Sequence, residues 1–216
     1  MKLIPLKNRR FLERLDKFAE SFYKRPHTFK RQPRPDVSFS TLNSYKSDAS
    51  FVGYPREHNY TDYAVPDYAM VHDVKQARWE DMRHFLLVAF KAGIPNADHP
   101  EWYYDTMCIQ PPEVGFTGWH NNKNKPHYSL RFIHNSGRGY SIERKGNKQI
   151  KFKDQHTVGA GQKDWTCLYS YYPADGSIWF ADRNMGDKPR LVVDIAIPVR
   201  YQKKAEAAVG FISTSP

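Results

Sequence analysis

The chain of 216 residues is long enough for one domain with its own core, or for one domain and an extension. Aromatic residues make up 15% and charged residues 26% of it, a composition that excludes a largely disordered chain. No apolar run approaches the roughly 20 residues that span a bilayer, so we expect no membrane span. The two cysteines, Cys108 and Cys167, are far apart, which excludes a disulfide framework and favours a reducing, cytoplasmic setting.

Positive charge is concentrated at the N-terminal end. Residues 1–35 hold eleven Lys and Arg against three acidic residues, a net of +8 out of the chain's +10, which leaves +2 for the other 181 residues. This pattern indicates a near-neutral body with a basic arm. The arm would contact an anionic partner, such as nucleic acid, an acidic protein or an anionic surface. A solvated helix face explains the same charges equally well.

The N-terminal part reads as helical and then irregular. Six apolar residues recur at helical spacing within residues 8–23: Phe11, Leu12, Leu15, Phe18, Ala19 and Phe22. We therefore expect residues 1–35 to be a basic helix and arm. Residues 36–72, rich in Ser, Pro and Tyr without a sustained period, are expected to be an irregular extended segment. A second helix is expected over residues 73–92, because Gly93 and Pro95 end an apolar stripe there.

From residue 102 onward the pattern changes to short strands rich in aromatic and β-branched residues. The expected strands are 102–109, 114–119, 128–134, 139–144, 148–153, 165–172, 177–182 and 190–198. Eight short strands after a helical part predict a mainly β fold with flanking helices, in the form of a double-stranded β-helix, the jelly-roll or cupin-like barrel. The barrel domain would cover residues 73–200, and residues 201–216 would form a C-terminal tail.

One stretch suggests chemistry. In "TGWHNNKNKP", residues 117–126, a histidine precedes an asparagine by two positions, just ahead of an expected strand. A barrel mouth can aim several ligands at one metal ion. In non-haem Fe(II) oxygenases two histidines and one carboxylate hold one face of the metal. An arginine suits the carboxylate of a bound keto acid, because its planar fork grips both oxygens.

This segment, together with "GSIWFADRNMGDKPRLVVDIAIP" at 176–198, resembles the iron(II)/2-oxoglutarate-dependent dioxygenase superfamily, in particular small phage-type members. The resemblance covers about residues 102–200. It implies Fe(II) and 2-oxoglutarate as cofactors, His120 and Asn122 as the first two metal positions, and Arg190 as the keto-acid clamp. It also implies a host-cytoplasm or virion setting.

The motif departs from the family at two positions. Residue 122 is Asn rather than an anionic ligand, and Phe180 stands where the distal histidine would fall, ten residues before Arg190. Asp182 is the replacement carboxylate that we expect, because it shares a strand face with Phe180. His127 and His134 are further candidates. The simpler interpretation is that Asp182 pairs with Arg183 or Arg190 and that His127 is a loop residue.

Two functions follow, and the sequence leaves both open. In the first, the protein is an Fe(II)/2-oxoglutarate oxygenase that hydroxylates an unknown substrate. In the second, the barrel has lost its metal and needs no cofactor. It then acts as a structural or binding protein, for example a viral structural component, whose basic N-terminal arm contacts the partner.

Overall fold

The structure is a computed structural model, and it describes residues 1–23, 104–110, 116–121, 126–134, 138–154 and 165–215. The irregular segment expected at 36–72, the helix expected at 73–92 and Asn122 lie outside the described residues.

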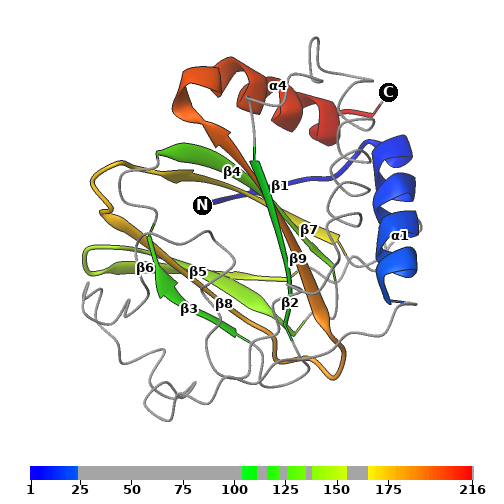
Figure 1. Cartoon of the computed structure of the whole chain (residues 1–216), viewed down its shortest axis with the longest axis horizontal. Coiled ribbons are helices and arrows are strands. Elements are labelled where there is room, and N and C mark those ends of the chain that lie inside the picture. Colours follow the sequence, from blue (N-terminus) through cyan, green and yellow to red (C-terminus); the bar gives the residue numbers. More distant parts are fainter. Residues whose placement is uncertain (24–103, 111–115, 122–125, 135–137, 155–164, 216) are drawn as a thin grey trace.

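The described chain is built mainly from two antiparallel sheets (Figure 1). Its strands are β1 (Lys2–Ile4), β2 (Tyr104–Gln110), β3 (Phe116–His120), β4 (His127–His134), β5 (Tyr140–Lys145), β6 (Lys148–Lys153), β7 (Trp165–Tyr172), β8 (Ile178–Arg183) and β9 (Arg190–Pro198). Sheet A has the order β1-β7-β4-β9-β2, and sheet B has the order β3-β8-β5-β6.

The pairing from β2 onward is nested. Strand β2 pairs with β9, β3 with β8, β4 with β7, and β5 with β6, all antiparallel. Two facing sheets joined in this way form a jelly-roll-like arrangement. The predicted mainly β, jelly-roll-like fold is therefore confirmed, and the eight expected strands agree with β2–β9 to within a few residues at each end. Closure of the two sheets into a continuous barrel stays a prediction.

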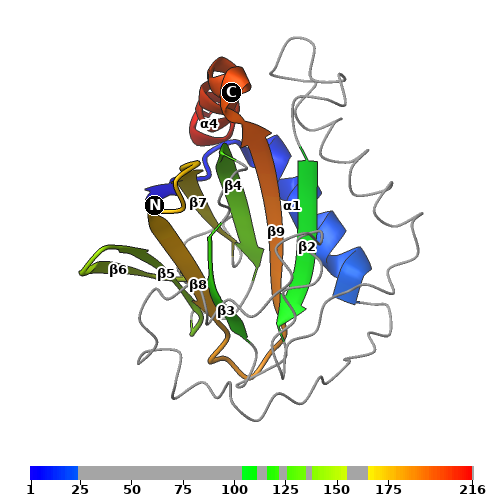
Figure 2. The ribbon, with the colours of Figure 1, turned by 60° about the vertical axis from the view of Figure 1, so that its left-hand side comes forward.

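The apolar core lies on the outer face of sheet A, the face turned away from sheet B (Figure 2). Alternate residues of three neighbouring strands form this face: Leu130 and Phe132 of β4, Trp165 and Cys167 of β7, and Leu191, Val193, Ile195 and Ile197 of β9. Two helices, α1 (Arg9–Tyr23) and α4 (Gln202–Ser213), cover it and contribute to the same cluster. No helix of the described residues is both long and apolar enough to cross a membrane.

Residues 1–19 are part of the body, which corrects the expectation that the N-terminal segment lies outside it. Strand β1 extends sheet A beside β7. Phe11 and Leu15 of α1 are 2% and 1% exposed within the core cluster. The Asn8 side chain caps α1 through the Phe11 amide, and its amide group donates to the Phe211 carbonyl of α4. Within α1 the charged residues are exposed or half-buried, while the apolar residues on its other face are buried.

The C-terminal residues form a helix rather than the expected tail. After the short 3-10 helix η2 (Val199–Tyr201), α4 places Ala205, Ala208 and Ile212 against sheet A, each 0% exposed. Their helical spacing puts one small apolar stripe on the sheet, so the helix closes the core above the strand ends.

Candidate functional site

The space between the two sheets holds a connected group of buried polar side chains beside a small apolar cluster of Ile133, Leu168 and Val192. Strand alternation turns Ser129 and Arg131 of β4, and Arg190 and Asp194 of β9, away from the apolar face. Asp182 of β8 approaches them from sheet B and is 2% exposed. A buried charge requires a partner. The contacts of these groups therefore decide whether any of them is available to bind a metal ion or a ligand.

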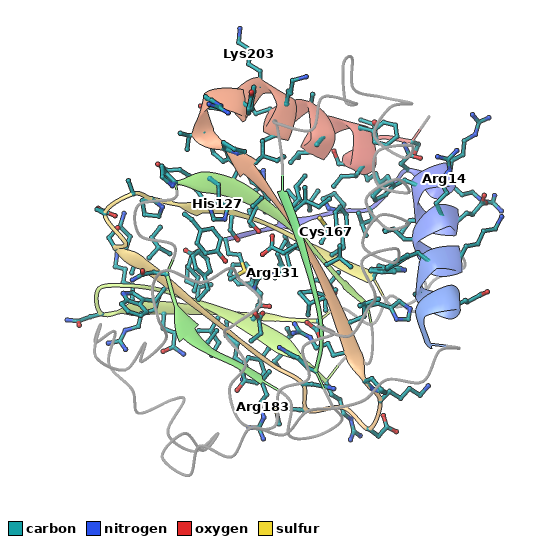
Figure 3. All side chains as sticks on the ribbon, in the orientation of Figure 1. Arg14, His127, Arg131, Cys167, Arg183 and Lys203 are labelled. Atoms are coloured by element: carbon teal, nitrogen blue, oxygen red, sulfur yellow. The ribbon has the colours of Figure 1, made fainter. Side chains whose placement is uncertain are left out.

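Arg131 joins both sheets (Figure 3). Its Nη1 donates to Asp182 Oδ2 of sheet B at 2.7 Å. Its Nη2 donates to Asp194 Oδ2 and to the Tyr172 hydroxyl, each at 3.0 Å. Ser129 Oγ also donates to Asp194, at 2.6 Å. Arg131 as a whole is 6% exposed, and its guanidinium is held by two carboxylates and a hydroxyl.

Arg190 forms the second half of the network and is 0% exposed. Its Nε and Nη2 donate to the two oxygens of Asp154 at 2.7 and 2.9 Å, a bidentate pair. Its Nη1 donates to Gln110 Oε1 at 3.0 Å, and its Nη2 also donates to Ser141 Oγ at 3.3 Å.

Ser141 connects the two halves, because its hydroxyl donates to Asp182 Oδ1 at 2.5 Å while it accepts from Arg190. Arg190 Nη1 lies 3.8 Å from the same Asp182 oxygen. We call Arg131, Asp154, Asp182, Arg190 and Asp194 the interior ion-pair cluster. It crosses the space between the sheets as one connected network.

The cluster keeps its arginines charged. Burial acts against the charge of Arg131, but Asp182 and Asp194 outweigh it and raise the pKa of its guanidinium well above the ordinary value. Burial likewise opposes the charge of Arg190, and Asp154 raises its pKa. Burial raises the pKa of the Tyr172 hydroxyl, so that group stays neutral while it accepts from Arg131.

The structure brings together the two segments that carry the sequence resemblance. Strand β3 pairs with β8, with His120 opposite Phe180 and Thr117 opposite Asp182, and with a register shift between Thr117 and His120. The Asn121 side chain donates to the Gly176 carbonyl at 3.1 Å, which ties the end of β3 to the turn before β8. His120 is described in its backbone position alone, so its assignment as a metal ligand stays a prediction, as does that of Asn122.

The two alternative histidines lie on opposite faces of β4. His134 is on the face of β4 that packs under the helices, with its ring 4.7 Å from that of Trp165. His127 is the first residue of β4 rather than a loop residue; it is 1% exposed and stacks on Tyr172 at 4.5 Å. Arg190, one of the two arginines expected to pair with Asp182, lies 3.8 Å from it. The closer partner of Asp182 is Arg131, at 2.7 Å.

Sequence reasoning missed Arg131, Asp154 and Asp194. A signal was present in two of them: Arg131 and Asp194 interrupt the apolar runs "LRFI" and "VVDIAI", where a charge can be buried only with a partner. The pairing itself depends on which strands become neighbours. Arg131 is opposite Asp194 in the β4–β9 register.

As they are placed, Asp182 and Arg190 do not fit the roles that the resemblance implies. Both Asp182 oxygens already accept short hydrogen bonds, and a dication beside them would face the Arg131 guanidinium at the distance of an ion pair. The fork of Arg190 already holds an internal carboxylate, that of Asp154. Among the described residues, no three His, Cys, Asp or Glu side chains are grouped so that they could hold a metal ion.

Comparisons with known proteins give similar structures but no family. No protein-family model matches the sequence, and no curated protein matches it. A cupin domain from Bordetella pertussis Tohama I is 18% identical, with a TM-score of 0.29, over 46% of this chain and 84% of that one. A predicted oxalate decarboxylase from Thermotoga maritima is 14% identical, with a TM-score of 0.30, over 48% of this chain and 72% of that one.

A dTDP sugar isomerase from Desulfovibrio desulfuricans G20 is 15% identical, with a TM-score of 0.30, over 56% of this chain and 78% of that one. Identities and TM-scores at this level carry no argument about activity. The fold class therefore rests on the nested strand order, and the site rests on its own residues.

Proposed function

We propose that the protein is a jelly-roll-like binding or structural protein rather than an Fe(II)/2-oxoglutarate oxygenase. The observation that carries this proposal is the bidentate pair between Arg190 and Asp154, both buried between the sheets. The guanidinium to which the resemblance assigns the keto acid is already held by an internal carboxylate. Asp182, the expected metal carboxylate, likewise pairs with Arg131 and accepts a hydrogen bond from Ser141 within the chain.

The interior ion-pair cluster then has a structural role. It joins sheet A to sheet B through Arg131 and Arg190, beside the apolar cluster of Ile133, Leu168 and Val192 against which Phe152 of sheet B packs. Removal of one member of a buried ion pair is costly, whereas the complete network satisfies its own charges. A rigid double sheet of this kind presents its outer strands and helices to a partner.

Part of the positive charge expected to contact an anionic partner belongs to the described body. Residues 1–23 hold six Lys and Arg against three acidic residues, a net of +3 out of the +8 counted for residues 1–35. The remaining +5 falls on residues 24–35, outside the described residues. We therefore assign the proposed anionic contact of this arm mainly to residues 24–35.

Anaerobic titration with Fe(II) and 2-oxoglutarate tests the proposal. We expect no metal-to-ligand absorption band and no rise in melting temperature at millimolar concentrations of both, because a ligand that binds only the folded state stabilises it. A band that appears in the wild type, disappears in His120→Ala and needs more 2-oxoglutarate in Arg190→Lys would overturn the proposal in favour of the oxygenase. As a control, circular dichroism of each variant checks that the variant is folded.

A further inference from the structure

The β5–β6 hairpin has an exposed outer edge. In the described part of sheet B, β6 is the last strand and pairs with β5 alone. Five of its six residues are exposed, and Phe152 is half-buried. Figure 2 shows the hairpin reaching outward from the rest of the double sheet. A strand in this position offers its outward N–H and C=O groups to another strand.

The hairpin is also the most basic part of the described chain. Residues 138–153 hold Lys or Arg at six positions and one acidic residue, a net of +5 within 16 residues, against +3 for residues 1–23. The basic residues are Arg138, Arg144, Lys145, Lys148, Lys151 and Lys153. The acidic residue, Glu143, pairs with the Met1 amino group, so it does not neutralise the lysines of β6.

The two faces of β6 differ in chemistry. Lys151 and Lys153 are opposite Ile142 and Tyr140 in the register, so they share one face, and Lys151 Nζ lies 3.6 Å from the centre of the Tyr140 ring. Ile150 and Phe152 are on the other face, and Ile150 is 51% exposed. From residue 150 to residue 153 the strand therefore alternates between apolar and cationic side chains, while Lys148 shares the face of Ile150 and Phe152.

We propose that β6 is the docking edge for an extended acidic segment of another protein, which adds to sheet B as a further strand. Residues directly opposite in a strand pair share a face and interact. The added segment then carries acidic residues opposite Lys151 and Lys153, and apolar residues opposite Ile150 and Phe152. Main-chain hydrogen bonds provide affinity, and the alternation of acidic and apolar residues provides specificity.

The same lysines disfavour a second copy of this chain as the occupant. An antiparallel β6–β6 pair would bring lysines of one copy close to those of the other, and like charges across a strand pair are destabilising. A nucleic acid would match the charge but would make no use of the exposed Ile150 or of the outward backbone groups. The pattern as a whole favours an acidic strand.

Fluorescence anisotropy with labelled peptides tests this. The probe is a capped peptide of about eight residues with alternating Glu and Val, the length of an ordinary strand. The controls are a peptide of the same composition with the glutamates and valines in two blocks, an N-methylated version of the alternating peptide, and a single-stranded oligonucleotide. We expect the alternating peptide to bind at least about tenfold more tightly than the block and N-methylated peptides.

The protein variants separate charge from strand addition. The double variant Lys151→Glu, Lys153→Glu should bind the Glu/Val peptide about tenfold or more weakly than the wild type does. The same variant should bind a Lys/Val peptide, which the wild type should not. Ile150→Asn should lower the affinity for the Glu/Val peptide without changing the charge of the protein. The matched control, Lys17→Glu with Lys203→Glu, makes the same charge change on α1 and α4 and should leave binding unchanged. Amide hydrogen exchange in β6 should slow when the peptide is bound.

Three results would overturn the inference: equal binding of the alternating and block peptides, tighter binding of the oligonucleotide through the same lysines, or no peptide binding at millimolar concentration. In the last case the lysines only keep the edge from pairing. None of these outcomes depends on Fe(II) or 2-oxoglutarate, so failure of this inference and failure of the proposed function are distinguishable.

Discussion

Replacing Arg131 with methionine should destabilise the fold strongly, because Arg131 pairs with one buried carboxylate, that of Asp182, and one half-buried carboxylate, that of Asp194. Met has a similar length and no charge, so the change removes the ion pairs to Asp182 at 2.7 Å and to Asp194 at 3.0 Å while it preserves much of the volume. The Asp182 side chain is 3% exposed and would be left with its hydrogen bond from Ser141 and the more distant Arg190. The Asp194 side chain is 17% exposed and keeps Ser129.

Removing one partner of a buried ion pair lowers the free energy of unfolding by about 3–5 kcal/mol. That is a large part of the total free energy of unfolding of an ordinary domain, about 5–15 kcal/mol. For a chain of this size each kcal/mol lowers the melting temperature by about 2–4 °C, so the expected decrease is roughly 6–20 °C. Most of the loss should come from Asp182, the more deeply buried of the two carboxylates.

Urea unfolding, followed by circular dichroism, measures the effect. The double variant Arg131→Met with Asp182→Asn should be less destabilised than Arg131→Met alone, because the unpaired carboxylate is gone. The exposed pair of Arg9 and Glu13 provides the control, since Arg9→Met should cost less than about 0.5 kcal/mol. The reasoning is refuted if Arg131→Met costs no more than Arg9→Met, or if Asp182→Asn adds to its cost.

Three further predictions concern other parts of the structure. Leu15→Ala, in the buried face of α1, should cost about 2–5 kcal/mol in urea unfolding, whereas Lys17→Ala on the solvent face should cost little; equal small effects would return α1 to the status of an arm. Gly139→Ala should destabilise by about 1–3 kcal/mol, because the added Cβ would lie 2.0 Å from an Asp154 oxygen, and unchanged stability would contradict this placement. Burial raises the pKa of Tyr169 from 10.0 to about 12, so its neutral form is favoured in the folded state and stability should fall as pH rises through this range. Tyr169→Phe should make that alkaline decline shallower, as urea unfolding at several pH values would show.

The sequence was sufficient for the strands. Each of β2–β9 has a short alternating or aromatic-rich run bounded by turn residues, and side-chain alternation is a local property of extended backbone. The helix at residues 9–23 was predicted for the same kind of reason, since its apolar spacing can be read without knowing what covers it. Where the sequence failed, as with β1 and α4, the segment was too short or too weakly patterned to stand out from a terminus.

The tertiary structure decided which face of each strand is the core. In β4, alternation along the sequence places Leu130 and Phe132 on one face and Arg131 on the other, but does not say which face meets which layer. The structure packs the face of Leu130 and Phe132 under α1 and α4 and turns Arg131 into the space between the sheets. Alternation determines which residues share a face. The neighbouring layers, here the two helices and sheet B, determine what each face packs against.

The sequence by itself determined that charges lie within apolar strands, as at Arg131, Asp182, Arg190 and Asp194. Only the tertiary structure decided their partners, because the nested pairing brings Arg131 within reach of a carboxylate 51 residues further along the chain and Arg190 within reach of one 36 residues before it. Sequence proximity had suggested Arg183 or Arg190 for Asp182. An ion pair depends on a separation of a few ångströms in space, and that separation is set by strand order and register, which no local pattern encodes.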